Sequence, residues 1–291
     1  MTPYVADPVY LNGQFLPLAE AGISPLDRGF LYGDGVYEII PVYSRRPFRL
    51  AEHLQRLQAT LAGIELANPL SVAEWTTLIE RLVAEAPWAD QSIYLQVTRG
   101  ADNKRDHAFP PASVAPTVFA FASPLVTPSA EVRAKGVSAI TVADQRWARC
   151  DLKVISLLAN ILARQHAVAA GCAEALLIRD GYMKEGAASN IFVVKNGVLL
   201  APPKTHLMLP GITYDIILDL ADSHGLPHEV REIGENELRG ADEVWMTSST
   251  KEVLAITQLD GQPVGHGTPG PVGEQMWQWY QDFKNSIMRK G

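Results

Sequence analysis

Three short turn signals in this 291-residue chain constrain how its strands can pair. Asn12-Gly13, Asp180-Gly181 and Asn196-Gly197 each lie between apolar segments of strand character. Asn-Gly and Asp-Gly are preferred in two-residue hairpin turns, because both central residues of such turns adopt positive φ angles. Strands joined by these turns run antiparallel. The chain is therefore expected to be an α+β protein with much antiparallel pairing, and not a doubly wound parallel sheet.

Helical and strand patterns alternate along the chain and predict two domains. Leucine and isoleucine at three- and four-residue steps predict a helix over residues 51–64, and a second helical pattern follows over residues 71–88. The later stretch "SPLVTPSAEVRAKG" is rich in Pro and Ser and has no long apolar period, which indicates a domain boundary. The predicted organisation is a small N-terminal α/β domain over residues 1–125, a linker over 126–135 and a larger C-terminal domain with antiparallel strands over 136–291.

Charge and composition narrow the classes of function. The formal net charge is −7 and the chain has no basic run, so a nucleic-acid partner is not expected. No apolar run has the length of a membrane span, and the first residues lack the basic and apolar parts of a signal peptide. The only two cysteines, Cys150 and Cys172, are too few for a disulfide framework or a zinc site. A cytoplasmic protein without a metal site is therefore expected.

Lys153 stands in an apolar setting that is unusual for a charged residue. It lies between Leu152 and the pair Val154-Ile155, just before a helical pattern that starts at Ser156. The apolar positions of that pattern are Leu157, Leu158, Ile161, Leu162 and Val168. Lysine is seldom buried without a partner, so a solvated charge at the boundary of an element is the ordinary interpretation. The alternative is a buried amine with a chemical role.

Three polar stretches of the second half are further candidates for chemistry. In "KEGAASN", Glu185 precedes small residues that let another group approach the backbone. In "LPGITYD", Gly211, Ile212 and Thr213 open a helix, whose free N–H groups suit an anion. In "TSST", four hydroxyl residues follow a strand, starting at Thr247. Taken singly, each has a commoner structural interpretation: an exposed hairpin glutamate, a threonine helix cap and a polar turn.

An amine, a carboxylate and two anion-binding stretches are the parts that a pyridoxal 5′-phosphate site requires. The amine forms a Schiff base, the acid keeps the ring nitrogen protonated, and the other two bind the phosphate. The chain also contains, in this order, "GDGVYE", "EHLQRL", "RCDLK", "EGAASNIF", "LPGIT" and "TSST". With these motifs the whole chain resembles the class IV aminotransferases, which are the fold type IV pyridoxal-phosphate enzymes. The resemblance implies their two-domain fold and this cofactor.

The resemblance also implies roles for individual residues. Lys153 would form the Schiff base and carry the proton between Cα and C4′ of the cofactor. Glu185 would hold the pyridine nitrogen, because a nearby negative charge favours the protonated ring. The other residues that the resemblance implies are Arg56, Ile212, Thr213, Ser249 and Thr250 at the phosphate, Tyr37 and Glu38 near cofactor and substrate, and Arg146 near the ring hydroxyl.

The loop "RGADNKRDHAFP" indicates one branch of this family. Arg105 and His107 match an Arg-x-His pair with which D-amino acid aminotransferases grip the substrate carboxylate in the partner subunit's site. A guanidinium suits this task because it holds a carboxylate in a two-pronged fork. The resemblance thus implies a homodimer that exchanges the amino group between D-amino acids, such as D-alanine or D-glutamate, and 2-oxo acids, such as 2-oxoglutarate or pyruvate.

Alternatives and departures accompany this interpretation. A branched-chain L-amino acid aminotransferase or an aminodeoxychorismate lyase would use the same cofactor residues. A non-catalytic phosphate-binding protein would need neither Lys153 nor Glu185. The Arg-x-His segment could also be a solvated basic loop without a role in binding. Ala187 and Ala188 stand where close D-amino acid relatives carry serines, and Tyr214 stands where the family often has arginine. The resemblance thus implies that hydroxyls beside the cofactor are lost at Ala187 and Ala188, and that one positive charge near the phosphate is missing at Tyr214.

Overall fold

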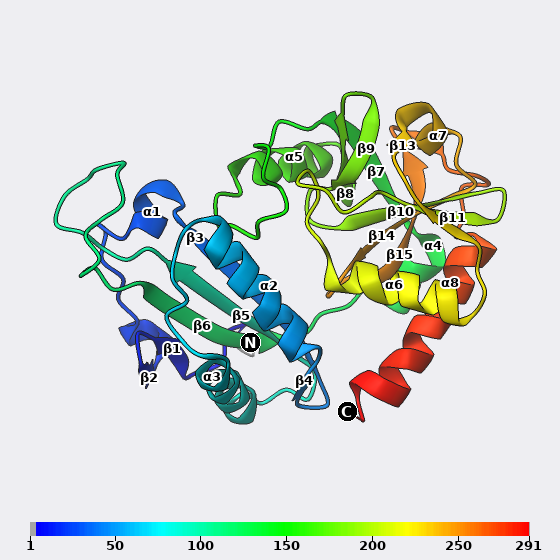
Figure 1. The fold of residues 1–291 in the computed structure, drawn as a ribbon. Helices are drawn as coiled ribbons and strands as arrows, with labels where there is room; N and C mark the ends of the chain where they lie inside the picture. Colours follow the sequence, from blue (N-terminus) through cyan, green and yellow to red (C-terminus); the bar gives the residue numbers. More distant parts are fainter. Residues whose placement is uncertain (1–3, 291) are drawn as a thin grey trace. The chain divides into compact units, whose positions relative to one another are not determined.

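The structure is a computed structural model that describes residues 4–290. The chain forms two compact units, which are described separately (Figure 1). The first unit takes in the chain up to Leu125, the segment Leu152–Ser156 and a C-terminal piece that starts at Met288. The second unit takes in Val126–Asp151 and Leu157–Ile287.

Within the described residues, the first unit contains a six-stranded antiparallel sheet in the order β2-β1-β6-β5-β3-β4 (Figure 1). Its strands are β1 (Val9–Leu11), β2 (Gln14–Leu16), β3 (Gly35–Tyr43), β4 (Arg46–Pro47), β5 (Gln91–Thr98) and β6 (Thr117–Pro124). The predicted hairpin joins β1 to β2. Its central residues Asn12 and Gly13 have φ angles of 48° and 91°, the positive values that a type I′ turn requires.

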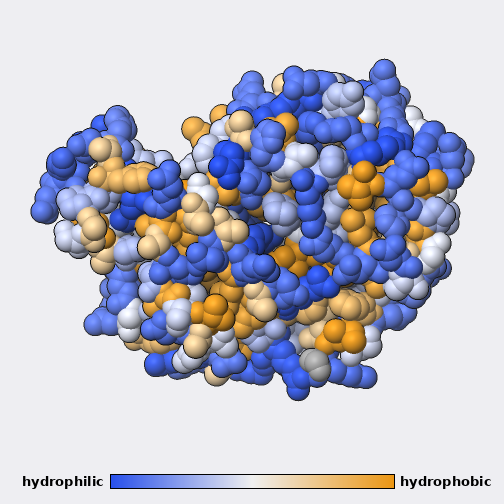
Figure 2. All heavy atoms as spheres, viewed as in Figure 1, coloured by the Kyte–Doolittle hydropathy of each residue, from blue (hydrophilic) through white to orange (hydrophobic). Residues whose placement is uncertain are grey.

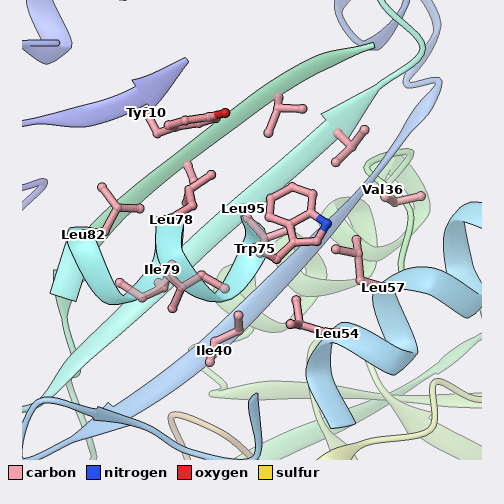
Figure 3. Close-up of a cluster of buried hydrophobic side chains, with 14 of the residues drawn as sticks. Tyr10, Val36, Ile40, Leu54, Leu57, Trp75, Leu78, Ile79, Leu82 and Leu95 are labelled. Carbon is pink, nitrogen blue, oxygen red and sulfur yellow. The ribbon is translucent and has the colours of Figure 1, made fainter. Parts of the chain in front are cut away.

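Two amphipathic helices pack on this sheet, α2 (Leu50–Gly63) and α3 (Val72–Glu85). Both agree with the predicted helical patterns, and Ser71 and Glu74 form a capping box at the start of α3. Two shorter helices, η1 (Leu18–Glu20) and α1 (Arg28–Tyr32), precede β3. The side chains labelled in the core of this unit (Figure 3) are Tyr10, Val36, Ile40, Leu54, Leu57, Trp75, Leu78, Ile79, Leu82 and Leu95.

The segment around Lys153 is part of the first unit, although the sequence placed it within the C-terminal domain over residues 136–291. The N–H of Tyr37 donates to the carbonyl of Lys153 at 3.0 Å, and the N–H of Ile155 donates to the carbonyl of Gly35 at 3.0 Å. These bonds attach the segment to the start of β3, because β4 pairs with β3 only near its other end. The backbone of Lys153 therefore lies beside that of Tyr37.

Within the described residues, the second unit contains a ten-stranded mixed sheet in the order β12-β11-β10-β14-β15-β7-β8-β9-β13, with β16 paired to β15. Its strands are β7 (Val137–Ala143), β8 (Glu174–Arg179), β9 (Tyr182–Gly186), β10 (Asn190–Lys195), β11 (Val198–Ala201), β12 (His228–Val230), β13 (Ile233–Gly234), β14 (Glu243–Ser248), β15 (Glu252–Leu259) and β16 (Gln262–Pro263). Three pairs are parallel: β11 with β12, β7 with β15 and β7 with β8. The Asp180-Gly181 and Asn196-Gly197 turns join the hairpins β8–β9 and β10–β11. A continuous meander of these strands, which the order of the turns in the sequence suggests, is wrong, because β10 pairs with β14 and β9 with β13.

The helices of the second unit are α4 (Ala130–Lys135), α5 (Leu158–Ala169), α6 (Ile212–Ser223), α7 (Glu235–Arg239) and α8 (Pro271–Phe283), which a π-helical turn, η2 (Lys284–Met288), continues. The predicted linker over residues 126–135 thus includes a helix, α4. Its N-cap is Ser129, and Arg133 pairs with Glu252 at 2.6 Å. Six residues are too few to reveal a helical period in the sequence. None of the helices described has the length and apolar character of a membrane span.

Helix α5 turns its small residues inward and its large apolar residues outward. Ala163 and Ala167 are buried against Ala175, Leu177 and Ala187 of the β8–β9 region. The exposed large side chains of α5 are Leu158 (69%), Ile161 (60%), Leu162 (50%) and Val168 (50%). Apolar side chains at the surface over α5 are visible among polar ones in Figure 2. The apolar pattern in the sequence therefore marks mainly an outward-facing stripe of this helix.

Candidate active site

Glu185 is a buried acid of the second unit. It lies near the end of β9, a strand that β8 and β13 cover on both edges. Its Oε1 accepts bonds from Nη1 of Arg146 and from the N–H of Leu209 at 3.2 Å. Within the described residues, its Oε2 has two longer contacts, at 3.3 Å to the same N–H and at 3.4 Å to Nδ2 of Asn190. Oε2 is therefore the oxygen with more capacity for another donor.

Burial raises the pKa of Glu185 to about 7, against the opposing effect of the Arg146 guanidinium and the N–H of Leu209. A carboxyl group with such a pKa is close to the balance between its neutral and ionised forms at neutral pH. A further positive group at Oε2 would shift this balance to the carboxylate, because an opposite charge nearby favours the ionised form.

Arg146 is fixed by Asp144 and directs one edge of its guanidinium at Glu185. Its Nε and Nη2 donate to the two oxygens of Asp144 at 2.9 and 3.0 Å, and Nη2 also donates to the carbonyl of Leu207 at 3.2 Å. Arg179 pairs with the same aspartate at 3.2 Å. Burial alone would raise the pKa of Asp144, but the bonds from Arg146 lower it. The contacts of Arg146 within the second unit thus make it a positioning residue for Glu185.

The start of α6 offers backbone donors for an anion. Ile212 and Thr213 are its first two residues and both are buried. Its N-cap is Gly211, and no side chain among residues 4–290 caps it. A Cβ on Gly211 would lie 1.9 Å from Oδ1 of Asn190, so any other residue here would displace the Asn190 side chain. The free N–H groups of a helix start, with a threonine hydroxyl beside them, fit a phosphate.

The hydroxyl residues at the end of β14 and just after it come to the same part of the second unit. Thr247 lies opposite Asn190 in the pairing of β14 with β10, and its buried Oγ1 has no hydrogen-bond partner among the described residues. Oγ of Ser248 accepts a bond from the N–H of Lys251 at 3.1 Å and lies 3.4 Å from Oγ1 of Thr250. Ser249 lies between them and is half-buried. Asn190 thus connects the acid, the glycine of the helix start and this hydroxyl turn.

Lys153 and Tyr37 meet in the first unit. Nζ of Lys153 lies 4.2 Å from the centre of the Tyr37 ring, and that ring stacks on Tyr94 with centres 5.8 Å apart. Within residues 4–290, no hydrogen bond or ion pair of Nζ is present, and the side chain is half-buried. The amine of Lys153 is therefore half-buried at the edge of a sheet, beside an aromatic face and, within residues 4–290, without a counter-charge.

Arg56 and Glu38 form a buried pair in the same unit. Nε and Nη2 of Arg56 donate to the two oxygens of Glu38 at 2.7 and 2.8 Å, and Nδ1 of His53 lies 2.9 Å from one of them. Burial raises the pKa of Glu38, but Arg56 and His53 lower it to about 2. Burial lowers the pKa of His53. Glu38 is therefore a carboxylate that holds the Arg56 guanidinium in a fixed orientation.

Arg105 and His107 are exposed on the loop between β5 and β6 of the first unit. The guanidinium carbon of Arg105 lies 5.2 Å from the centre of the Tyr32 ring, and the His107 ring lies 5.5 Å from it. Both side chains of the loop therefore lie against the ring of Tyr32 in α1.

The residues that depart from the family pattern have structural partners. Ala187 is buried against α5, where its carbonyl accepts a bond from Asn160 at 2.9 Å, whereas Ala188 is exposed. Tyr214 is a core residue: its hydroxyl donates to the carbonyl of Pro202 at 2.8 Å, and burial raises its pKa to about 12. The Tyr214 side chain therefore supplies packing, and no positive charge, beside the helix start.

Sequence reasoning missed Asn190, Leu209 and Arg28. Asn190 was visible as the last residue of "EGAASN", where a polar residue opens an apolar strand, but it was given no role. Leu209 takes part through its backbone N–H, for which its side chain gives no signal. Arg28 holds the loop of Arg105 and His107 through contacts almost 80 residues apart in sequence.

The comparisons with known proteins cover nearly the whole chain. The family model for class IV aminotransferases matches residues 35–259. The chain is 42% identical to a D-alanine aminotransferase of Bacillus licheniformis, over 96% of this chain and 97% of the relative, and 38% identical to one of Listeria monocytogenes over 94% of each. A solved structure from T.th., a branched-chain amino acid aminotransferase with pyridoxamine 5′-phosphate, has a TM-score of 0.88 and 31% identity and covers 98% of this chain and 95% of its own.

Proposed function

The chain belongs to the class IV aminotransferase family, and we propose that it transfers the amino group of a D-amino acid to a 2-oxo acid with pyridoxal 5′-phosphate as its cofactor. Suitable donors are D-alanine and D-glutamate, and suitable acceptors are 2-oxoglutarate and pyruvate. The single observation that carries the assignment is the 42% identity with a D-alanine aminotransferase over 96% of this chain. The branched-chain alternative rests on similar folds at 31% and 28% identity, and a fold alone does not determine the substrate.

The residues present fit the cofactor. Lys153 has an amine without a hydrogen-bonding or ionic partner among residues 4–290. The Oε2 oxygen of Glu185 has contacts at 3.3 and 3.4 Å and no shorter one in the described part of the chain. The start of α6 and the unpartnered Oγ1 of Thr247 within the described residues offer donors for a phosphate. When bound, pyridoxal 5′-phosphate forms a Schiff base with an amine, and its protonated ring accepts the electrons released as the Cα–H bond breaks.

We assign the cofactor contacts on this basis. Lys153 holds the carbonyl end and Glu185 the ring nitrogen. The residues that we assign to the phosphate are Ile212 and Thr213 at the start of α6, Ser249 and Thr250 after β14, and Arg56 on α2. Because Glu38 holds the Nε–Nη2 edge of the Arg56 guanidinium, this arginine is oriented before the phosphate arrives, which reduces the entropic cost of binding.

Lys153 and Glu185 divide the chemistry between them. Lys153 would supply the amine that removes the proton from Cα, and the face of Tyr37 would stabilise the ammonium that results. Glu185 keeps the ring nitrogen protonated with its carboxylate. Arg146, held by Asp144, keeps that carboxylate in place without using its Oε2.

Arg105 and His107 bind the substrate carboxylate in this proposal. They fix one substituent of Cα while the cofactor fixes the nitrogen. Only one enantiomer then turns its Cα hydrogen toward Lys153. The exposure of both side chains on a loop allows them to reach a substrate beyond their own unit's core.

A cytoplasmic homodimer completes the proposal. The cytoplasmic location is supported by Cys150 and Cys172, which are both free thiols. The dimer is supported by the outward stripe of α5, where Leu158, Ile161 and Leu162 are at least half exposed. Large apolar side chains grouped on one helix face are typical of a contact surface. In this dimer the loop of Arg105 and His107 serves the partner subunit's site.

The dimer can be tested by mixing an inactive variant with one of low activity. We expect Lys153→Ala and Arg105→Ala subunits, dissociated and reassociated together, to recover turnover with D-alanine. Each hybrid dimer would then combine the native Lys153 of one subunit with the native Arg105 of the other. Sedimentation of the mixture checks that dimers form. Absence of recovery in hybrid dimers, or an active wild-type monomer at assay concentrations, would contradict the arrangement.

The proposed reaction is tested by steady-state turnover with matched enantiomers. We expect the wild-type enzyme to form pyruvate from D-alanine and 2-oxoglutarate with a higher kcat/KM than from L-alanine, and to be slow with L-leucine. Faster turnover of L-leucine than of every D-amino acid tried would favour the branched-chain alternative instead.

A further inference from the structure

We propose that Arg28 is the positioning residue for the substrate-gripping loop, defined as residues 101–116 between β5 and β6, and that it sets the affinity for the substrate carboxylate through Arg105 and His107. This inference rests on the proposed function of these two residues. It assigns to α1, a helix remote in sequence from the loop, a part in substrate recognition.

The guanidinium of Arg28 binds the loop backbone on both sides of His107. Its Nη1 donates to the carbonyl of Asp106 at 2.7 Å and to that of Ala108 at 3.1 Å, and Nη2 approaches the carbonyl of His107 at 3.4 Å. These are three consecutive carbonyls of the segment that carries both gripping side chains. A planar group with five donors can hold several carbonyls at once, which an ammonium cannot do with the same geometry.

Arg28 is itself held rigidly. It is 6% exposed, its Nε donates to Asp34 at 2.8 Å, and Arg99 donates to the same carboxylate at 2.9 and 3.1 Å. Burial raises the pKa of Asp34, but Arg99 and Arg28 lower it below its ordinary value. The backbone N–H of Arg28 also donates to the carbonyl of Gly100 at 2.8 Å, at the base of the loop. Arg28 is therefore bonded to residues just before β3 and just after β5, and not only to the loop.

One turn further along α1, Tyr32 supports the side chains of the loop. Its ring centre lies 4.9 Å from the guanidinium carbon of Arg28, 5.2 Å from that of Arg105 and 5.5 Å from the ring centre of His107. Residues four apart in a helix lie on the same face. Helix α1 thus holds the loop backbone with Arg28 and its two polar side chains with Tyr32.

A second arginine of the first unit provides a matched control. Arg45 donates to the carbonyls of Ala86 and Trp88 at 3.0 and 3.3 Å and to those of Val83 and Ala84, each at 2.8 Å. It therefore also holds several backbone carbonyls, but at the end of α3. Arg45→Lys removes a comparable clamp without touching the substrate-gripping loop.

The experiment compares Arg28→Lys, Arg45→Lys and wild-type holoenzyme. Arg28→Lys keeps a positive charge for Asp34 but loses the fork, so we expect KM for D-alanine to rise on the order of 10-fold with kcat changed much less. Amide hydrogen exchange in a peptide covering residues 101–112 should accelerate in Arg28→Lys and not in Arg45→Lys. If Arg28→Lys fails to fold, Tyr32→Leu, which removes the aromatic support, should give the same two changes.

A double-mutant cycle decides whether Arg28 acts through Arg105. Arg105→Ala alone should lower kcat/KM for D-alanine roughly 10- to 100-fold. In that background Arg28→Lys should lose most of its effect on KM, because the grip that it positions is already gone. Additive effects, or an unchanged KM and loop exchange in Arg28→Lys, would overturn the inference while D-alanine turnover by the wild type keeps the proposed function intact. A wild type that turns over no D-amino acid would overturn both.

Discussion

Lys153→Ala should abolish transamination, with single-turnover rates at least about 10³-fold below wild type, because both the attachment of the cofactor and the proton transfer at Cα are lost. The reason lies in the position of the amine. Nζ lies 4.2 Å from the Tyr37 ring centre and has no hydrogen-bond or ion-pair partner in the described part of the chain. Such an amine is available for covalent bonding without the cost of breaking an ion pair.

A covalent label provides a readout of Lys153 that does not depend on turnover. Borohydride treatment of the wild-type holoenzyme should attach the reduced cofactor to the peptide that contains Lys153. Lys184→Ala is the control, because Nζ of Lys184 also lies over a tyrosine, 5.2 Å from the Tyr182 ring centre, but is paired with Glu232 at 2.7 Å. Labelling of another lysine in the wild type, or full turnover by Lys153→Ala, would show that Lys153 is not the lysine that binds the cofactor covalently.

Glu185→Gln should leave the cofactor bound and slow removal of the Cα proton on the order of 10²- to 10³-fold. The amide keeps the shape of the side chain but cannot supply the negative charge that keeps the ring nitrogen protonated. Stopped-flow measurement of the half-reaction with D-alanine separates this step from product release. An unchanged single-turnover rate would exclude Glu185 from the mechanism.

The same substitution should change how stability depends on pH in the cofactor-free protein. The folded-state pKa of Glu185 is raised from 4.5 to about 7, so its contribution to the free energy of unfolding is greatest below pH 4.5 and is lost as the pH rises through 7. Between pH 5 and pH 8 the wild type should therefore lose Tm relative to Glu185→Gln. If the Tm of both proteins changes with pH in the same way, ionisation of Glu185 does not contribute to the pH dependence of stability.

Local patterns predicted most of the elements that form this fold. The helical patterns over residues 51–64 and 71–88 correspond to α2 and α3, and the Asn-Gly and Asp-Gly turns correspond to hairpins. These signals are local: a helix needs one apolar face and a hairpin needs positive φ at its turn. Short elements such as α4, in the predicted linker, were not predicted, because six residues are too few to show a helical period.

The sequence predicts less well which other residues contact the candidate site residues. The order of the motifs predicts Lys153 and Glu185 as site residues. The residues that hold the site in place come from segments far away in the sequence. Arg146 reaches Glu185 across 39 positions, and Arg28 reaches the carbonyl of Asp106 across 78. Such pairs depend on the sheet topology, and an ion pair between distant arginine and carboxylate residues leaves no periodic signal.

The outward stripe of α5 shows where a sequence pattern has two physical interpretations. Apolar residues at helical spacing predict a face that avoids water. They do not specify whether that face packs inside one chain or against another, and in α5 the inward face is formed by Ala163 and Ala167. The alanines permit close packing on the β8–β9 region, so the larger side chains remain for the proposed dimer contact.

The stereochemical half-reaction tests the central claim most directly. Purified yellow enzyme is mixed with D-alanine, L-alanine or L-leucine without a 2-oxo acid, and the loss of yellow absorbance is followed in time. If the enzyme is a D-amino acid transaminase, we expect rapid loss of yellow absorbance with D-alanine and rates at least about 100-fold lower with both L-amino acids. The reason is that an L-amino acid bound by the same carboxylate contacts would point its Cα hydrogen away from Lys153. Faster loss with L-leucine than with any D-amino acid would contradict the account.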